Sequence, residues 1–212
     1  MFEIIPGILE KDFLEIERKI ELVRRFSKVI HIDIIDGKFA PNTSFLDPKP
    51  FEKYTRDLFF EAHLMVEEPI NYLEPFAASG FKRFLGHIEK MSDQVEFVAK
   101  GEFLAEVGLA IDLDTQLDSI KSSFEDLDSI LIMSVKAGFS GQSFMPQALE
   151  KIKKIREKSQ VPIEIDGGIN EAVLEEAFSC GVNRFVTTSF LFNGNPSDNY
   201  QKLVSEARKL NG

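Results

Sequence analysis

The sequence predicts an α/β protein with the architecture of a (β/α)8, or TIM, barrel. Short β-branched and apolar runs recur along the 212 residues, and a longer stretch with helical spacing follows each of them, giving eight such pairs. No linker and no shift of composition divides the chain, so we expect a single domain over residues 1–212. An open doubly wound sheet is the alternative, but eight parallel strands with helices of near-equal length favour closure.

The predicted strands are apolar enough to lie buried between helices. They are Phe2–Ile5, Val29–Ile35, Phe59–Val66, Arg83–His87, Ala105–Ile111, Ser129–Val135, Pro162–Asp166 and Arg184–Ser189. In a barrel of this type, the chemistry lies at the carboxyl ends of the strands and in the loops that follow them. Candidate functional residues are therefore sought at those strand ends.

Three amphipathic stretches predict helices most clearly. In Asp12–Phe26 the apolar residues share one face and the charged residues take the other, as in a helix that packs on a sheet. Pro146–Lys158 begins with a proline, whose missing N–H costs nothing in the first turn. A third helix is expected after Asn170, which is a suitable N-cap.

Composition narrows the classes of function. The chain has 25 Lys and Arg against 35 Asp and Glu, and the formal net charge of −10 argues against nucleic acid and anionic membranes as partners. There is no run of about 18 apolar residues and no basic leader before an apolar run, so we expect a cytoplasmic protein. Cys180 is the only cysteine, which excludes a disulfide within the chain.

Polar side chains interrupt the second predicted strand. With period two, His31 and Asp33 share the face that points into the barrel, while the isoleucines point to the helices. A buried ionised carboxylate must be paired, protonated or bound to a cation. Taken alone, this pair is explained equally well by a satisfied His–Asp hydrogen bond.

Two further strands bring similar residues to the same place. His63 shares a face with Met65 in the third predicted strand, and Asp166 ends the seventh. Two imidazoles and two carboxylates from three strand ends suit a divalent ion, Zn²⁺ first, with Fe²⁺, Mn²⁺ and Co²⁺ as rivals. His87, which ends the fourth strand, is interpreted as a neighbour of such a site or as a hydrogen-bonded rim residue, and not as a ligand.

Three segments lie where barrel enzymes bind phosphate. Gly138-Phe139-Ser140-Gly141-Gln142 follows the sixth strand, Gly167-Gly168 ends the seventh, and Thr188-Ser189 ends the eighth. Backbone N–H groups and hydroxyls at these positions can bind a dianion. In an acidic protein, an anionic substrate would be held by such N–H groups and by the metal.

The motifs resemble those of the ribulose-phosphate 3-epimerase family in the same order. The matching segments are His31-Ile32-Asp33-Ile34-Ile35-Asp36-Gly37-Lys38-Phe39-Ala40-Pro41-Asn42, His63-Leu64-Met65-Val66 with Pro69, Met133-Ser134-Val135 through Gly138–Phe144, and Ile163-Glu164-Ile165-Asp166-Gly167-Gly168-Ile169. The likeness covers residues 5–192. Ordered motifs of this length are much more specific than a lone glycine pattern.

The resemblance implies a (β/α)8 barrel enzyme that epimerises a ketose phosphate at C3. It implies His31, Asp33, His63 and Asp166 as metal ligands, with Asp33 and Asp166 also acting as acid and base. Inversion of a centre beside a carbonyl needs one group on each face, and two carboxylates from different strands satisfy that need. A homo-oligomer, dimer or hexamer, is expected by the same analogy. The residues expected to contact the substrate are Gly7, His63, Met65, Met133, Gly138, Phe139, Ser140, Gly141, Gly167, Gly168, Thr188 and Ser189.

Several positions depart from the family pattern. Gly7 stands where the family has a substrate-contacting serine, and Thr188 stands where it has a glycine that lets the backbone approach phosphate. The other departures are Ile35 for methionine, Ala137 for proline, Ser140 for glycine, and Asp112-Leu113-Asp114-Thr115 for a Pro/Gly turn. They spare the metal and acid/base positions and touch substrate recognition. Room at Gly7 favours, as one alternative, a ketose phosphate with one more carbon.

Four functions are therefore weighed. The first is interconversion of D-ribulose 5-phosphate and D-xylulose 5-phosphate, and the second is epimerisation of a hexulose phosphate such as D-allulose 6-phosphate. The third is a non-catalytic relative that binds metal or sugar phosphate. A decarboxylase or aldolase of a related barrel branch is disfavoured, because those carry Asp-x-Lys-x-x-Asp where this chain has His31-x-Asp33-x-x-Asp36.

Overall fold

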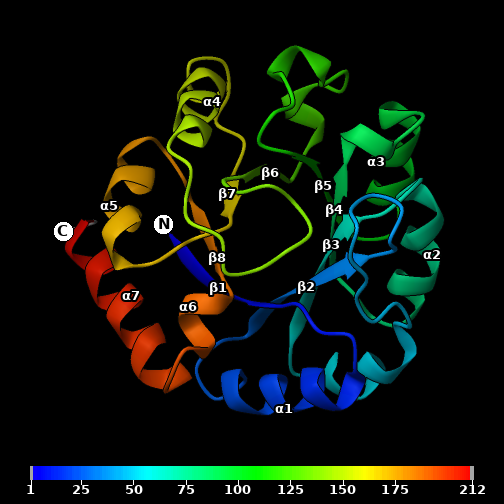
Figure 1. Ribbon diagram of the computed structural model, residues 1–212. Coiled ribbons are helices and arrows are strands. Elements are labelled where there is room, and N and C mark those ends of the chain that lie inside the picture. Colours follow the sequence, from blue (N-terminus) through cyan, green and yellow to red (C-terminus); the bar gives the residue numbers. More distant parts are fainter. Residues whose placement is uncertain (1, 211–212) are drawn as a thin grey trace.

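Eight parallel strands form a closed barrel in which each strand pairs with the next along the chain and β8 pairs with β1. The computed structural model describes residues 2–210. Figure 1 views the barrel along its axis, with the helices in an outer ring. The strands are β1 (Glu3–Ile8), β2 (Val29–Ile35), β3 (Phe59–Met65), β4 (Arg83–His87), β5 (Glu106–Ile111), β6 (Ser129–Met133), β7 (Ile163–Asp166) and β8 (Arg184–Thr187). The predicted fold class is confirmed.

The first strand is longer than predicted. It runs to Ile8 instead of ending at Ile5, because Pro6 pairs with Thr187 of β8 and Gly7 pairs with His31 of β2. The Pro-Gly pair is typical of a turn in isolation, but here pairing with strands on both sides outweighs that local preference. The extension carries residue 7 to the mouth of the barrel.

The helices are α1 (Phe13–Val23), α2 (Ile70–Ala78), α3 (Gln94–Glu102), α4 (Gln147–Arg156), α5 (Glu171–Ser179), α6 (Ser189–Phe192) and α7 (Pro196–Leu210). The prediction of near-equal helices was wrong. α6 has 4 residues and α7 has 15. The β2–β3 connection contains only the 3-10 helix η1 (Lys49–Tyr54), and the β5–β6 connection only η3 (Leu117–Ser119) and η4 (Phe124–Asp126). The remaining 3-10 helix, η2 (Ile88–Lys90), follows β4.

Helix starts follow the predicted signals. The Asp12 side chain accepts a hydrogen bond from the Leu14 N–H and caps α1, and the Asn170 side chain does the same with the Ala172 N–H for α5. Pro146 directly precedes α4. These caps satisfy N–H groups that have no partner inside a helix, and so they fix where each helix leaves its loop.

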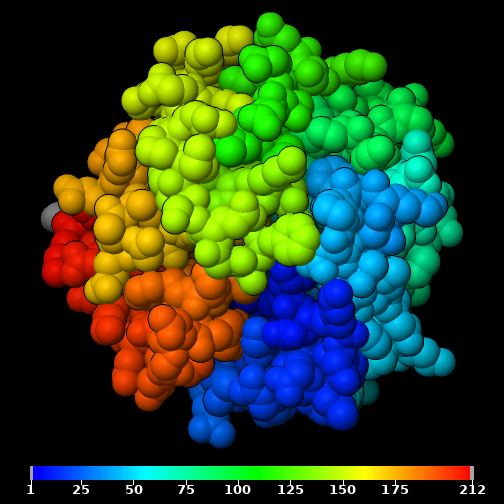
Figure 2. Space-filling model, viewed as in Figure 1, coloured from blue at the N-terminus to red at the C-terminus, as the bar shows by residue number. Residues whose placement is uncertain are grey.

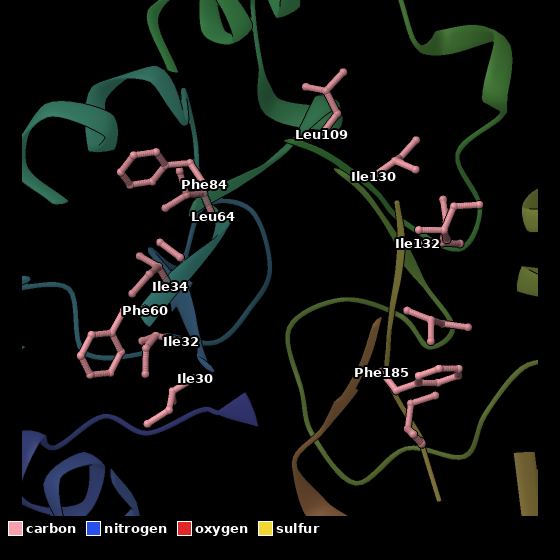
Figure 3. Packing of buried hydrophobic residues seen from close by; sticks show 14 of the residues in the cluster. Ile30, Ile32, Ile34, Phe60, Leu64, Phe84, Leu109, Ile130, Ile132 and Phe185 are labelled. Atoms are coloured by element: carbon pink, nitrogen blue, oxygen red, sulfur yellow. The ribbon is translucent and has the colours of Figure 1, made fainter. Parts of the chain in front are cut away.

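Two apolar clusters lie on the two sides of the strands. The larger one fills the layer between sheet and helices, and Figure 3 shows Ile30, Ile32 and Ile34 of β2 in it. The smaller one lies inside the barrel mouth and contains Met65 and Met133. The period-two interpretation of β2 is therefore confirmed, because its isoleucines pack outward and its alternate residues point into the barrel.

The segment between β6 and α4 crosses the mouth of the barrel, where it is drawn in yellow-green in Figure 1. In the space-filling view of Figure 2, the same segment covers the centre of this face. The candidate site described below lies beneath it. Within residues 2–210, no helix has the length and apolar character that a membrane crossing requires.

Candidate active site

Four buried side chains meet inside the barrel mouth. His31 and Asp33 come from β2, His63 from β3 and Asp166 from β7. One nitrogen or oxygen of each lies within 4.8 Å of those of the others. The parallel register places Asp33 directly beside His63, which brings two of the four side chains together. The structure thus gathers the four predicted ligands into one cluster.

The atoms that face the centre of the cluster are defined by their distances. Nδ1 of His63 lies 2.9 Å from Oδ1 of Asp33 and 3.5 Å from Oδ2 of Asp166. Nε2 of His31 lies 3.3 Å from Oδ1 of Asp33, yet this buried nitrogen makes no hydrogen bond with any described residue. A buried polar atom without a partner, among two imidazoles and two carboxylates, fits a divalent cation.

The ring of His31 is held from its other nitrogen. Nδ1 lies 2.7 Å from Oε1 of Glu61 and 3.2 Å from Oε1 of Glu164, and both glutamates are buried. Arg83 neutralises Glu61 through an ion pair. A carboxylate on the outer nitrogen fixes the orientation of an imidazole, so Nε2 of His31 is directed to the cluster.

A chain of hydrogen bonds holds His63 in the same way. Its Nε2 lies 2.9 Å from Nε2 of His87, and Nδ1 of His87 lies 2.8 Å from Oε2 of Glu89. The other oxygen of Glu89 accepts the N–H of Asp112 at 2.7 Å. If the lone pair of His63 Nδ1 faces the cluster, His63 Nε2–H donates to Nε2 of His87, and His87 Nδ1–H donates to Glu89. Glu89 is then the final acceptor of the chain. The interpretation of His87 as a neighbour of the cluster fits this geometry.

The two aspartates of the cluster differ in their affinity for a proton. Burial would raise the pKa of Asp33, but the imidazoles of His31 and His63 hold it well below its ordinary value. Burial and the nearby charge of Asp33 raise the pKa of Asp166 to about 8. Burial lowers the pKa of His31, but the surrounding carboxylates outweigh it and raise the pKa well above its ordinary value. The cluster therefore favours a positive charge at its centre.

His31, Glu61 and Glu164 form a second group with the spacing of a cation site. Burial and the charge of Glu61 raise the pKa of Glu164 to about 7, whereas Glu61, opposed by burial, is held to a pKa of about 2 by His31 and Arg83. A guanidinium already supplies the positive charge at this group. The four-residue cluster above it is thus the better candidate for a metal.

A pocket opens from the cluster toward the loops. Every predicted substrate contact lines it except Gly7 and His63, both of which are buried. The predicted residues that line the pocket are Met65, Met133, Gly138, Phe139, Ser140, Gly141, Gly167, Gly168, Thr188 and Ser189, together with the two aspartates, Asp33 and Asp166. The lining also includes five residues that were not predicted: Leu9, Val135, Gln142, Ile169 and Val186. Gly138 has φ +110°, and a side chain there would press on Ala40, so both conformation and space require glycine. All three segments predicted to bind phosphate contribute residues to this pocket.

The loop over the pocket is tied to its surroundings. The backbone N–H of Ala137 donates to Oδ1 of Asp112 at 3.1 Å, and Nδ2 of Asn42 donates to the carbonyl of Gly138 at 2.8 Å. A proline at position 137 would have no N–H to donate. The two departures at Asp112 and Ala137 are thus joined by a hydrogen bond that anchors the start of the loop.

Replacement of Asp112 by alanine is expected to loosen the start of this loop. The variant loses a hydrogen bond to a carboxylate, so exchange of the Ala137 amide hydrogen should become about 10- to 100-fold faster. Hydrogen exchange resolved over the peptide that carries residue 137 measures this. Asp112→Asn keeps the oxygen acceptor and serves as the matched control. Equal protection in the alanine variant and the wild type would contradict the anchoring role.

The polar residues behind the cluster were not singled out from the sequence. Glu61 lies two residues before His63, and Glu164 lies two residues before Asp166. The period-two pattern that placed the histidine and the aspartate inside the barrel therefore also placed these glutamates there. No sequence pattern singled out Arg83, the ion-pair partner of Glu61. Its ion pairs depend on how β4 is aligned with β3 and β5.

Comparison of the sequence with known families gives a match that covers residues 3–192. The matching model is described as "Ribulose-phosphate 3 epimerase family". Among curated relatives, the ribulose-phosphate 3-epimerase of Chlamydia pneumoniae is 36% identical over 199 residues, which cover 88% of this chain and 86% of the relative. The enzyme of that name from Bacillus subtilis is 31% identical over 98% of this chain and 99% of its own. The cytoplasmic isoform from Oryza sativa is 32% identical over 90% of this chain and 87% of its own.

Solved structures share the fold at low sequence identity. A structure of KGPDC from Streptococcus mutans superposes with a TM-score of 0.77 at 12% identity, over 100% of this chain and 99% of its own. The 3-hexulose-6-phosphate synthase from Salmonella typhimurium gives a TM-score of 0.73 at 12% identity, over 99% of this chain and 100% of its own. At such identities the likeness concerns the barrel alone.

Proposed function

The chain belongs to the ribulose-phosphate 3-epimerase family of carbohydrate epimerases, and on that premise we propose that it interconverts D-ribulose 5-phosphate and D-xylulose 5-phosphate. The observation that carries the proposal is the pair of buried aspartates, Asp33 on β2 and Asp166 on β7, that line one pocket. Asp33 has a lowered pKa, and the pKa of Asp166 is raised to about 8. Two such groups around one pocket supply a base and an acid at the same pH.

The proposed reaction moves one proton at C3 of the ketose. One aspartate takes the C3 proton from one face, and the electron pair of the C–H bond passes to the C2 carbonyl to give an enediolate. The other aspartate donates its own proton to C3 on the opposite face, which inverts the centre. Asp33 on β2 and Asp166 on β7 come from strands that do not pair with each other, which supports an approach from two sides.

His31, Asp33, His63 and Asp166 would hold a divalent metal ion. When bound, such an ion supplies positive charge that polarises the C2 carbonyl and stabilises the enediolate. It also relieves the repulsion between the two aspartates. Zn²⁺ is the first choice for two imidazoles and two carboxylates, and Fe²⁺, Mn²⁺ and Co²⁺ suit the same donors.

The phosphate of the substrate would bind on the opposite side of the pocket. Gly141, Gly168 and Ser189 line this pocket and also a second pocket that contains neither aspartate, and their backbone N–H groups and one hydroxyl suit a dianion. Met65 and Met133 pack together in the apolar cluster of the mouth and would cover the sugar carbons. The sugar would thus extend from the aspartates to the glycines.

The structure removes the reason for expecting a hexulose phosphate as substrate, which was free space at Gly7. The room expected at Gly7 is filled, because a Cβ built there overlaps the hydroxyl of Thr188 and lies 2.8 Å from Cγ1 of Val186. The glycine thus leaves no free space at this position, so the alternative with one more carbon has no support from Gly7. This observation supports the pentulose as substrate.

Turnover measured on purified, metal-replete protein tests the proposal. D-Ribulose 5-phosphate and D-allulose 6-phosphate are supplied in parallel, and formation of the C3 epimer is followed for each. The proposal expects the pentulose to give the higher kcat/KM. Dominant turnover of the hexulose would reverse the substrate assignment, and no turnover of either with metal bound would support a non-catalytic binding protein.

A further inference from the structure

Gly7 and Thr188 occupy one shared space at the barrel mouth. Residue 7 lies near the carboxyl end of β1, and its backbone pairs with that of His31 on β2. A Cβ at this position would overlap Oγ1 of Thr188, which follows β8. The threonine side chain therefore stands where a side chain of residue 7 would stand, and only a glycine at residue 7 leaves room for it.

The position of the Thr188 hydroxyl points to a ligand. Its side chain does not cap α6, although Thr188 directly precedes that helix. It lies over β1, beside the strand that carries His31, and Thr188 lines the same pocket as Asp33 and Asp166. Thr188 thus belongs to the pocket that also contains the two aspartates and the Gly167-Gly168 backbone.

We propose that Thr188 is a specificity-determining residue whose hydroxyl hydrogen-bonds an oxygen of the sugar chain, and that Gly7 serves to make room for it. The proposal rests on the proposed function and names the part of the substrate that is recognised. The phosphate is assigned to backbone N–H groups around Gly141 and Gly168, whereas the Thr188 hydroxyl lies against Gly7 of β1. A sugar hydroxyl and a threonine hydroxyl can each donate or accept, so they are matched partners.

The first test separates the sugar from the phosphate. Thr188→Val keeps the shape and removes the hydroxyl, so the KM for D-ribulose 5-phosphate should rise about 3- to 12-fold, which corresponds to one neutral hydrogen bond. The kcat should change less than the KM. Thr188→Ser should restore most of the affinity. Inorganic phosphate, used as a competitive inhibitor, should keep its inhibition constant in all three proteins.

Three results of this test would overturn the proposed role of the hydroxyl. An unchanged KM in Thr188→Val would show that the hydroxyl contributes no binding. An inhibition constant for inorganic phosphate that rises in parallel with the KM would show that the hydroxyl contacts the phosphate and not the sugar. A serine variant as weak as the valine variant would show that the methyl group, and not the hydroxyl, matters.

The second test addresses the shared space. Gly7→Ala is expected to lower the melting temperature by about 5 °C, because overpacking a tight site is destabilising, or to displace Thr188 and raise the KM as Thr188→Val does. Adding Thr188→Gly to the Gly7→Ala variant should restore part of the lost melting temperature, because the contact of the new Cβ with Val186 remains. Effects of the two substitutions that simply add, or a Gly7→Ala variant with unchanged melting temperature and KM, would overturn the shared occupancy.

The two proposals fail in different ways. A wild-type protein that does not epimerise D-ribulose 5-phosphate refutes the proposed function and with it the assigned hydrogen bond. The melting temperatures of Gly7→Ala, Thr188→Gly and the double variant are measured without substrate. They therefore test whether residue 7 and Thr188 compete for the same space, whether or not the protein is an epimerase. An active wild type with an unaltered Thr188→Val variant refutes the further inference alone.

Discussion

Asp33→Asn and Asp166→Asn are each expected to lower epimerisation by at least about 1,000-fold while the barrel still folds. Each variant removes one of the two proton-transferring groups, and general acid–base catalysis alone is typically worth about 100- to 10,000-fold. Turnover of D-ribulose 5-phosphate measures the loss. Circular dichroism and the melting temperature report whether the fold is kept.

Exchange of the C3 hydrogen with deuterated solvent assigns the two faces. If each aspartate serves one face, a single variant still exchanges the C3 proton of one epimer without inverting it. Asp33→Asn and Asp166→Asn should therefore retain exchange in opposite epimers. Epimerisation by the double variant, or exchange of the same epimer in both single variants, would contradict the two-base assignment.

A matched control for these substitutions lies far from the mouth. Asp57 is an exposed aspartate that precedes β3, at the opposite end of the barrel from the site. Asp57→Asn removes the same charge and should leave kcat/KM within about twofold, since an exposed ion pair contributes little. The metal content of each variant is measured in parallel, because the two site aspartates are also proposed ligands.

Removal of the metal is expected to abolish activity and to lower stability together. Chelation followed by dialysis should leave protein that Zn²⁺, Fe²⁺, Mn²⁺ or Co²⁺ reactivates. A ligand that binds only the folded state stabilises it by about 2.7 kcal/mol at a concentration 100 times its dissociation constant. For a chain of this size, that corresponds to a rise of roughly 5–10 °C in the melting temperature.

The metal content of variants distinguishes the two buried groups. His63→Ala should reduce binding below one ion per chain, because His63 belongs only to the four-residue cluster. Glu164→Gln should retain one ion, because this glutamate belongs only to the group that Arg83 already neutralises. The reverse pattern would place the ion in the lower group. Full activity in demonstrably metal-free protein would exclude a metal role altogether.

The sequence predicted the fold through local patterns that tertiary structure leaves intact. The alternation in Val29–Ile35 predicted both the outward isoleucines and the inward His31 and Asp33, and the structure has both. Length and turn type were less predictable. β1 extends through a Pro-Gly pair because both β2 and β8 pair with it. Those two strands are distant in the sequence, so a short segment around Pro6 could not predict the extension.

The candidate site was predictable where it depends on strand pattern and unpredictable where it depends on contact. The four cluster residues follow the period-two pattern of their strands and could be named in advance. The contact between Gly7 and the Thr188 side chain could not be predicted. The two residues lie near opposite ends of the chain and meet only because β8 pairs with β1. The hydrogen bond between Asp112 and Ala137 likewise joins two separate loops.

The carboxyl groups inside the barrel give the interior a directional character. Glu61, Glu164, Asp33 and Asp166 are all buried inside it, and Arg83 lies toward the amino ends of the strands. Where no cation is bound, a phosphate dianion placed at the centre would meet the carboxylates of Asp33 and Glu61 in a medium that screens charge poorly. Under the proposed function, the phosphate would stay at the rim, and only the uncharged carbonyl end of the sugar would reach these carboxylates.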